Sequence, residues 1–147
     1  MIIIMRNILR FSALTLICIA CQSGQEYKTF RTEVLTYHDQ VMVDSEKAIS
    51  RKMKLDKISR QMDSLFSKKI VPDTVKEKRQ IGQLIGKLNS VDEQMIDWMH
   101  DFKADIDGKS NEEASVYFKA EKQKIIVLDS LYKAVLSESD AYLLKYK

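Results

Sequence analysis

The chain has 147 residues, enough for one domain, and its single Pro and four Gly favour helix over sheet. Lys and Arg number 24 against 21 Asp and Glu, but Arg6 and Arg10 lie in an N-terminal segment without acidic residues, which leaves 22 against 21 beyond it. The sequence pI of 8.8 therefore derives largely from that segment. A basic surface for nucleic acid is not expected.

Residues 1–20 are typical of a secretory signal peptide. Arg6 and Arg10 precede the apolar run from Phe11 to Ala20, and a small residue ends the run. The run has about half of the ~20 residues that a membrane-spanning helix needs.

Cys18-Ile19-Ala20-Cys21 resembles the lipobox of bacterial lipoproteins, although Cys18 stands where Leu is usual. The resemblance implies diacylglycerol on the Cys21 sulfur, cleavage after Ala20 and acylation, typically with palmitate, of the new N-terminus. Several acyl chains anchor a protein firmly. Gln22, by resemblance to the sorting rule of enteric bacteria, implies the outer membrane, facing the periplasm. The alternative is an ordinary secreted protein in which Cys21 is a free thiol.

After a flexible tether at residues 21–27, the sequence predicts a first helix up to about Lys69. Its main apolar column recurs every seven residues, and a second column accompanies its first half. The main column is Val34, Val41, Ala48, Leu55 and Met62; the second is Leu35, Met42 and Ile49. Polar residues such as Arg51 and Lys52 weaken the middle of the apolar face.

Pro72 breaks this helix, because it disfavours a helical residue before it. Residues 74–77 fit a capping box that begins a central helix ending near Asp107. Apolar residues repeat at sevens from Ile81 to Ile106 in three adjacent columns, so this wide face is expected to lie between two other helices. Gly82 and Gly86 mark either a close helix contact or tolerated surface positions.

Gly108 is expected to cap the central helix, and residues 110–113 form a second capping box. A third helix follows, with one column of Ala114, Glu121, Leu128, Val135 and Tyr142 and another of Phe118, Ile125 and Tyr132. The predicted fold is all-α: residues 28–147 form an up-down-up antiparallel three-helix bundle with long, coiled-coil-like helices.

The histidine and methionine residues suggest two interpretations. Helix register brings His38, Met42, Met95 and Met99 near Trp98. Imidazole and thioether groups bind Cu(I), so a periplasmic site for Cu(I) or another metal is the alternative function. Core packing is the simpler explanation, because Met commonly fills gaps in cores. The prediction is therefore no metal and no cofactor, with those four residues as candidates. His100 is expected to be solvated.

An acidic series on the central helix requires a partner. Glu93, Asp97, Asp101 and Asp105 repeat every four residues, a spacing at which like charges repel. Ion pairs with lysines of the third helix are the expected answer, at Lys119, Lys122 and Lys124. A divalent-ion site or a basic partner is the alternative.

Enzyme signatures are missing from the sequence. It contains no GxSxG, no HExxH, no Gly-rich phosphate loop and no Cys/His cluster. Lipidation would also consume Cys21, the one cysteine left after cleavage. Catalysis is therefore not expected.

Residues 37–42, YHDQVM, and 91–99, VDEQMIDWM, resemble segments of small Bacteroidota lipoproteins often labelled "viral A-type inclusion protein". The resemblance covers the whole chain in layout. It implies a helical envelope lipoprotein without an assigned activity. The positions that it singles out are His38, Asp39, Met42, Asp92, Met95, Asp97, Trp98 and Met99.

The sequence thus predicts a lipid-anchored structural or partner-binding module. Apolar residues lie beyond the main columns, at Leu35, Met42, Ile49, Ile96, Ile126, Leu136 and Leu143. An uncovered apolar column marks an interaction surface, so the first half of the first helix is expected to contact a partner protein or a second copy. The alternative is that this helix rotates and buries both columns. The last four residues, Leu144-Lys145-Tyr146-Lys147, resemble the tail by which the murein lipoprotein is joined to peptidoglycan.

Overall fold

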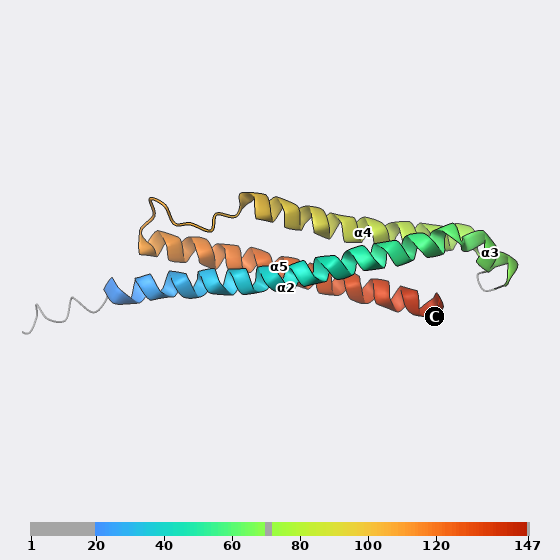
Figure 1. Cartoon of the computed structure of the whole chain (residues 1–147), viewed down its shortest axis with the longest axis horizontal. Helices are drawn as coiled ribbons and strands as arrows, with labels where there is room; N and C mark the ends of the chain where they lie inside the picture. Colours follow the sequence, from blue (N-terminus) through green and yellow to red (C-terminus); the bar gives the residue numbers. More distant parts are fainter. Residues whose placement is uncertain (1–19, 70–71, 147) are drawn as a thin grey trace, which may run out of the picture.

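A computed structural model describes residues 20–69 and 72–146. The helices are α2 (Ala20–Arg60), α3 (Met62–Ser67), α4 (Thr74–Asp101), α5 (Asn111–Leu143) and a short 3-10 helix, η1 (Leu144–Tyr146). These described residues contain no strand, so the all-α prediction is confirmed. The helices pack side by side into a rod, in which α2 and α5 run in one direction and α4 runs back (Figure 1).

In the first helical segment, one series of residues spaced by seven faces the interior of the bundle. The main column of Val34, Val41, Ala48, Leu55 and Met62 is fully buried, as predicted. A repeat of seven keeps one column facing its neighbours along helices that wind around one another. The segment is not one helix up to Lys69, however: α2 ends at Arg60, and α3 begins at Met62.

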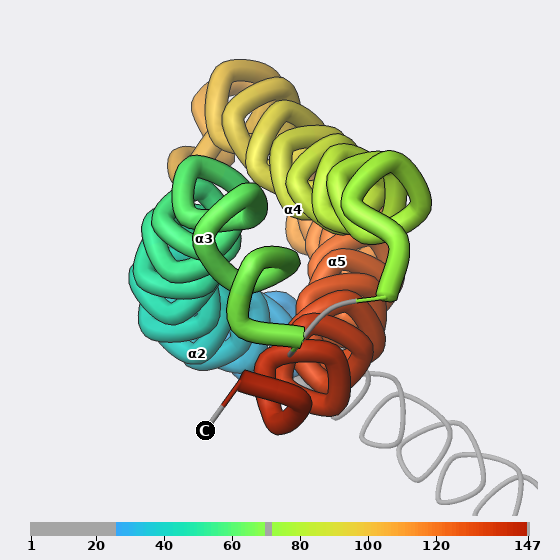
Figure 2. The backbone as a smooth tube through the Cα atoms, turned by 90° about the vertical axis from the view of Figure 1, so that its right-hand side faces the viewer, coloured from blue at the N-terminus to red at the C-terminus, as the bar shows by residue number. Residues whose placement is uncertain are grey.

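The three long helices form a triangle when the rod is viewed from its α3 end (Figure 2). Two of the three predicted apolar columns of α4 are buried as far as Trp98. The third column is only partly covered, since Ile85 is half-buried and Met99 is 39% exposed. The predicted end near Asp107 is wrong, because α4 stops at Asp101 and Phe102 has extended backbone (φ −66°, ψ 129°). The Phe102 ring then stacks on Trp98, with 4.8 Å between centroids.

The connection from α4 to α5 contains a tight turn. The Lys109 amide donates to the Ile106 carbonyl at 2.8 Å, and Gly108 lies between them with a φ of +76°. Such a φ is easy only for glycine, so Gly108 serves this turn rather than capping α4 directly.

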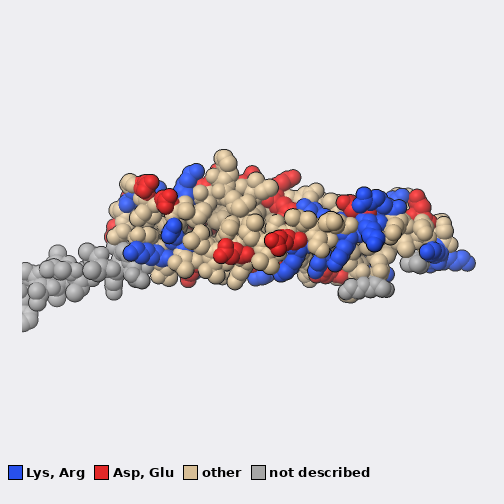
Figure 3. Space-filling view, viewed as in Figure 1, with Lys and Arg blue, Asp and Glu red and all other residues tan. Residues whose placement is uncertain are grey.

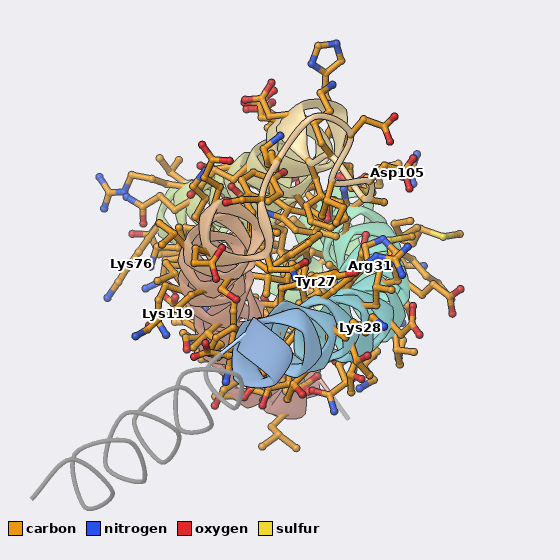
Figure 4. The ribbon with its side chains drawn as sticks, turned by 90° about the vertical axis from the view of Figure 1, so that its left-hand side faces the viewer. Tyr27, Lys28, Arg31, Lys76, Asp105 and Lys119 are labelled. Carbon is orange, nitrogen blue, oxygen red and sulfur yellow. The ribbon has the colours of Figure 1, made fainter. Side chains whose placement is uncertain are left out.

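This connection is tied back to the start of α2. Arg31 Nε donates a 2.9 Å hydrogen bond to the carbonyl of Ala104. In the end-on view of Figure 4, Arg31 and Asp105 lie on the same side of the bundle, whereas Lys119 lies on the opposite side. The bond therefore links the connection to the flank of α2 that faces away from Lys119.

The capping box of α5 is confirmed. The Ser110 hydroxyl accepts from the Glu113 amide at 3.2 Å, and the Glu113 carboxylate accepts from the Ser110 amide at 2.8 Å. These bonds with Ser110 lower the pKa of Glu113. Both predicted apolar columns of α5 are buried along their whole length.

The start of α4 differs from its prediction. Asp73, rather than Thr74, caps the helix, and its carboxylate accepts from the Lys76 amide at 3.0 Å. Glu77 does not complete a capping box because its carboxylate instead accepts hydrogen bonds from Tyr142 and Tyr146. The acidic side chain thus connects α4 to the end of α5.

Gly82 and Gly86 are surface positions, not close contacts between helices. A Cβ atom added at either residue would meet nothing within 4 Å. The interpretation that these glycines admit a neighbouring helix is therefore wrong.

The predicted signal peptide lies outside the described residues, apart from Ala20. The structure places residues 20–27 in α2 rather than in a flexible tether. Tyr27 already belongs to the bundle, since its ring stacks on Phe118 at 6.4 Å between centroids. Among the helices that the structure describes, none is both long and apolar enough to cross a membrane.

Candidate interaction surface

His38 lies against α4, at the level of Trp98. The centroids of the two rings are 6.1 Å apart, and His38 Nδ1 is 3.2 Å from the Asp39 carboxylate. His100 is on the outer side of α4, with 87% of its side chain exposed, as expected.

The candidate methionines occupy two environments. Met95 is buried in the core at 2% exposure, whereas Met42 and Met99 are 38% and 39% exposed. Core packing thus accounts for Met95 but not for the other two. The described residues hold no group of three or more His, Cys, Asp or Glu suited to a metal ion. Methionine sulfur is not among these ligand types, so the copper site at His38, Met42, Met95 and Met99 stays the alternative to the prediction of no metal.

The acidic series of α4 makes its contact with the expected lysines at longer range, since Glu121 and, to a smaller extent, the charge of Asp101 raise the pKa of Lys124. At short range, Lys122 binds Glu33 of α2 at 2.8 Å, and Lys124 binds Glu121 of its own helix at 2.8 Å. Within residues 20–69 and 72–146, no ion pair joins the series to Lys119, Lys122 or Lys124. Asp105 also leaves the series, because α4 ends before it.

A buried acid lies beside Trp98. The indole Nε1 donates to Glu121 at 2.9 Å, and the second oxygen of Glu121 accepts from Lys124. This bond to Glu121 raises the pKa of Lys124. The acidic residue in an otherwise apolar column of α5 is therefore satisfied on both oxygens.

Asp92 joins all three long helices, an arrangement that the sequence did not reveal. Its carboxylate accepts from Ser45 at 3.3 Å, Lys52 at 2.6 Å and Tyr132 at 2.7 Å. Burial, together with the bond to Asp92, raises the pKa of the Tyr132 phenol. The polar middle of α2, expected to be a weak part of the interface, therefore carries a cross-helix hydrogen-bond network, which we call the Asp92 network.

An apolar column remains uncovered on the α4-facing flank of α2. Leu35, Met42 and Ile49 are 37%, 38% and 49% exposed. Met42 and Ile49 alternate with His38, Ser45 and Lys52 at spacings of three and four residues, so they share one side of the helix. The prediction of an exposed column is confirmed, and the alternative in which rotation of the helix buries it is wrong.

Two apolar residues of α4 extend this column across the helix pair. Ile96 is 59% exposed and Met99 39% exposed. They follow Asp92 by four and seven residues, on the flank from which Asp92 binds Ser45 and Lys52 of α2. We call Leu35, Met42, Ile49, Ile96 and Met99 the α2–α4 apolar strip.

The other apolar residues beyond the main columns do not form such a surface. Leu136 and Leu143 are buried at 8% exposure, so the expectation that they lie at the edge of the core is wrong. Ile126 is half-buried. Among the apolar residues that the sequence placed beyond the main columns, the exposed ones thus lie on α2 and α4.

Comparison with known proteins adds no relative. No family model, no curated protein and no solved structure matches the chain. The surface must therefore be interpreted from its own chemistry.

Proposed function

We propose that this chain is a lipid-anchored protein of the bacterial cell envelope with a non-catalytic, partner-binding role. Its up-down-up three-helix bundle, in which α3 prolongs the first helix, would be held to the outer membrane, facing the periplasm, through acyl chains on Cys21. The bundle would serve as a rigid carrier for a binding surface. The charged start, apolar run and lipobox-like segment of residues 1–21 support the anchor.

The observation that carries the binding role is the α2–α4 apolar strip. Burial of one such side chain typically contributes about 1.5–3 kcal/mol, so leaving five partly exposed forgoes a large stabilisation. A contiguous apolar patch on a protein surface commonly marks an interaction site. A partner protein or a second copy would bury it.

The position of the strip suits an anchored protein. Leu35 follows Cys21 by 14 residues, about 21 Å along a helix. The strip therefore begins close to the proposed anchor and lies within reach of another envelope protein.

Metabolic labelling with radioactive palmitate tests the anchor. Label is expected on the native chain and should disappear in Cys21→Ala, which removes the only sulfur proposed to carry lipid. Persistence of the label in that variant would refute the assignment of Cys21.

Photo-crosslinking in the native envelope tests the strip. A photoreactive residue at Leu35 is expected to give one discrete crosslinked product, which the double variant Met42→Lys, Ile49→Lys should abolish. Val43→Lys is the matched control, because Val43 is 52% exposed but lies outside the strip. Circular dichroism must show that all variants keep their helix content. A double variant that unfolds instead would place Met42 and Ile49 in the core and contradict the proposal.

A further inference from the structure

The folded rod separates its charges, although the sequence is nearly balanced. The Asp92 network marks the boundary between two halves. The half with α3, which we call the basic half, comprises residues 47–69, 72–87 and 133–146 and contains 14 Lys and Arg against 6 Asp and Glu. The acidic half, residues 20–46 and 88–132, contains 7 Lys and Arg against 15 Asp and Glu. In Figure 3, Lys and Arg gather over the second half of α2.

A groove opens in the basic half, between α2 and α5. Its volume is about 840 Å³. The α2 side contributes Arg51, Lys54 and Lys57, and Lys54 and Lys57 are exposed. Such a row of cations along one wall attracts an acidic ligand.

The lining also contains apolar side chains from both walls. Ile58 contributes from α2, and Ala141, Leu143 and Leu144 contribute from α5 and η1. Leu144 is 61% exposed, so the apolar lining is open to a ligand. The lining has one acidic residue, Asp140, whose carboxylate accepts two hydrogen bonds from the Arg51 guanidinium. Because Arg51 and Asp140 neutralise each other, Lys54 and Lys57 are the dominant charges of the groove.

We propose that this groove binds an acidic amphipathic helix of a partner protein. Apolar side chains of that helix would cover Ala141 and Leu144, while its carboxylates would meet Lys54 and Lys57. A helix laid into a groove through its apolar face is a common mode of peptide recognition. The residues from Arg51 to Gln61 span about 15 Å, or roughly three turns of a bound helix.

Two other occupants fit the groove less well. A polysaccharide polyanion would satisfy the lysines, but its hydroxyl groups would lose hydrogen bonds to water where they lie against Ile58 and Leu144. A second copy offers an acidic half, but copies anchored through Cys21 in one membrane stand in the same direction, which brings halves of like charge together. This last step rests on the proposed function.

The binding test uses the chain from residue 21 onward with Cys21→Ser, which keeps every core residue of the bundle. The probe is a fluorescent helical peptide of about 20 residues with Leu at the core heptad positions and Glu on the flanks. Fluorescence anisotropy should show saturable binding, weakened about tenfold or more by the double variant Lys54→Glu, Lys57→Glu, because opposing charges are replaced by like charges.

The matched control is the double variant Lys76→Glu, Arg79→Glu. It changes the net charge equally in the same half of the rod, but on exposed positions of α4 outside the groove. The proposal requires that this control keeps the affinity of the native chain within about twofold. If both double variants weakened peptide binding equally, the effect would come from net charge in general, and binding in the groove would be contradicted.

Further probes separate the other occupants. Equal binding of heparin, of a peptide with Leu replaced by Ser, or of vesicles of anionic phosphatidylglycerol would overturn the amphipathic helix as the ligand. Sedimentation that shows self-association abolished by Lys54→Glu, Lys57→Glu would instead make a second copy the occupant. The Cys21→Ser chain used for peptide binding carries no lipid, and its α2–α4 apolar strip is unchanged. The result of the peptide-binding test is therefore independent of the outcome of the lipid-labelling and crosslinking experiments.

Discussion

The Trp98 indole donates a 2.9 Å hydrogen bond to the Glu121 carboxylate, and both side chains are almost completely buried. The bond joins α4 to α5 at the acidic residue of the α5 column. A buried acceptor that loses its donor costs about 1–3 kcal/mol. The bond is therefore expected to stabilise the packing of α4 on α5.

Trp98→Phe is expected to lower the free energy of unfolding by about 1–3 kcal/mol, because Glu121 loses a buried donor. Urea unfolding followed by circular dichroism measures the change. Glu121→Gln is the control: its side-chain oxygen still accepts from the indole, so a smaller loss is expected. An equal loss in both variants would assign the effect to the charge of Glu121 and its pair with Lys124.

The Asp92 network provides a second prediction. Asp92→Ala leaves the Lys52 ammonium, only 23% exposed, without its carboxylate, so we expect a loss of roughly 2–4 kcal/mol. The double variant Lys52→Met, Asp92→Leu should be more stable than Asp92→Ala, since no unpaired charge remains. Lys87→Ala breaks the exposed pair with Glu138 and should cost less than about 1 kcal/mol. Equal losses in Asp92→Ala and Lys87→Ala would contradict the importance of the network.

Replacing glycine by alanine should raise the stability at two positions and lower it at a third. Gly82→Ala and Gly86→Ala lie in α4 with open space around the added Cβ, so each should stabilise the protein by about 0.5–1 kcal/mol. Gly108→Ala should destabilise it by about 1 kcal/mol, because its φ of +76° strains any other residue. Thermal unfolding of the three variants measures the effect. A destabilising Gly82→Ala or Gly86→Ala would indicate a contact on that face of α4.

The hydrogen bonds of Glu77 with Tyr142 and Tyr146 predict that the stability of the protein depends on pH. Burial alone would raise the pKa of Glu77, but hydrogen bonds from Tyr142 and Tyr146, together with the charges of Lys145 and Lys76, hold the pKa below its ordinary value of 4.5. Because the folded chain has the lower pKa, this stabilisation is present above pH 4.5 and is lost as the pH falls through the folded value.

Glu77→Gln keeps an acceptor but cannot titrate. The native chain should be more stable than this variant at pH 7, and the difference should shrink as the pH falls to about 3. Unfolding in urea at a series of pH values measures it. A difference independent of pH would show that the charge of Glu77 does not contribute.

Most of the fold was predictable because one rule governs it. A repeat of seven identified the buried residues of each long helix, from Val34 in α2 to Tyr142 in α5. The end of α4 was not predictable in this way. Phe102 and Ile106 continue the repeat, but Phe102 stacks on Trp98 and contacts Phe118 with extended backbone, which a periodic pattern does not reveal.

The candidate surfaces were predictable only in part. The uncovered column of α2 follows directly from its position beside the main column. The Asp92 network could not be predicted, because Ser45, Lys52 and Tyr132 come from helices whose relative rotation the sequence leaves open. The groove likewise depends on how α2 and α5 separate near Ile58 and Leu144.

The separation of charge makes the net charge a poor guide to the behaviour of this protein. Salt screens charges beyond about 8 Å under physiological conditions, whereas α2 alone extends about 60 Å. Each half of the rod therefore presents its own sign to an approaching surface. At neutral pH and low salt, the chain from residue 21 should be retained on both a cation exchanger and an anion exchanger, each resin holding the opposite end. Proteins of the same near-zero charge that mix their charges evenly would pass through both columns.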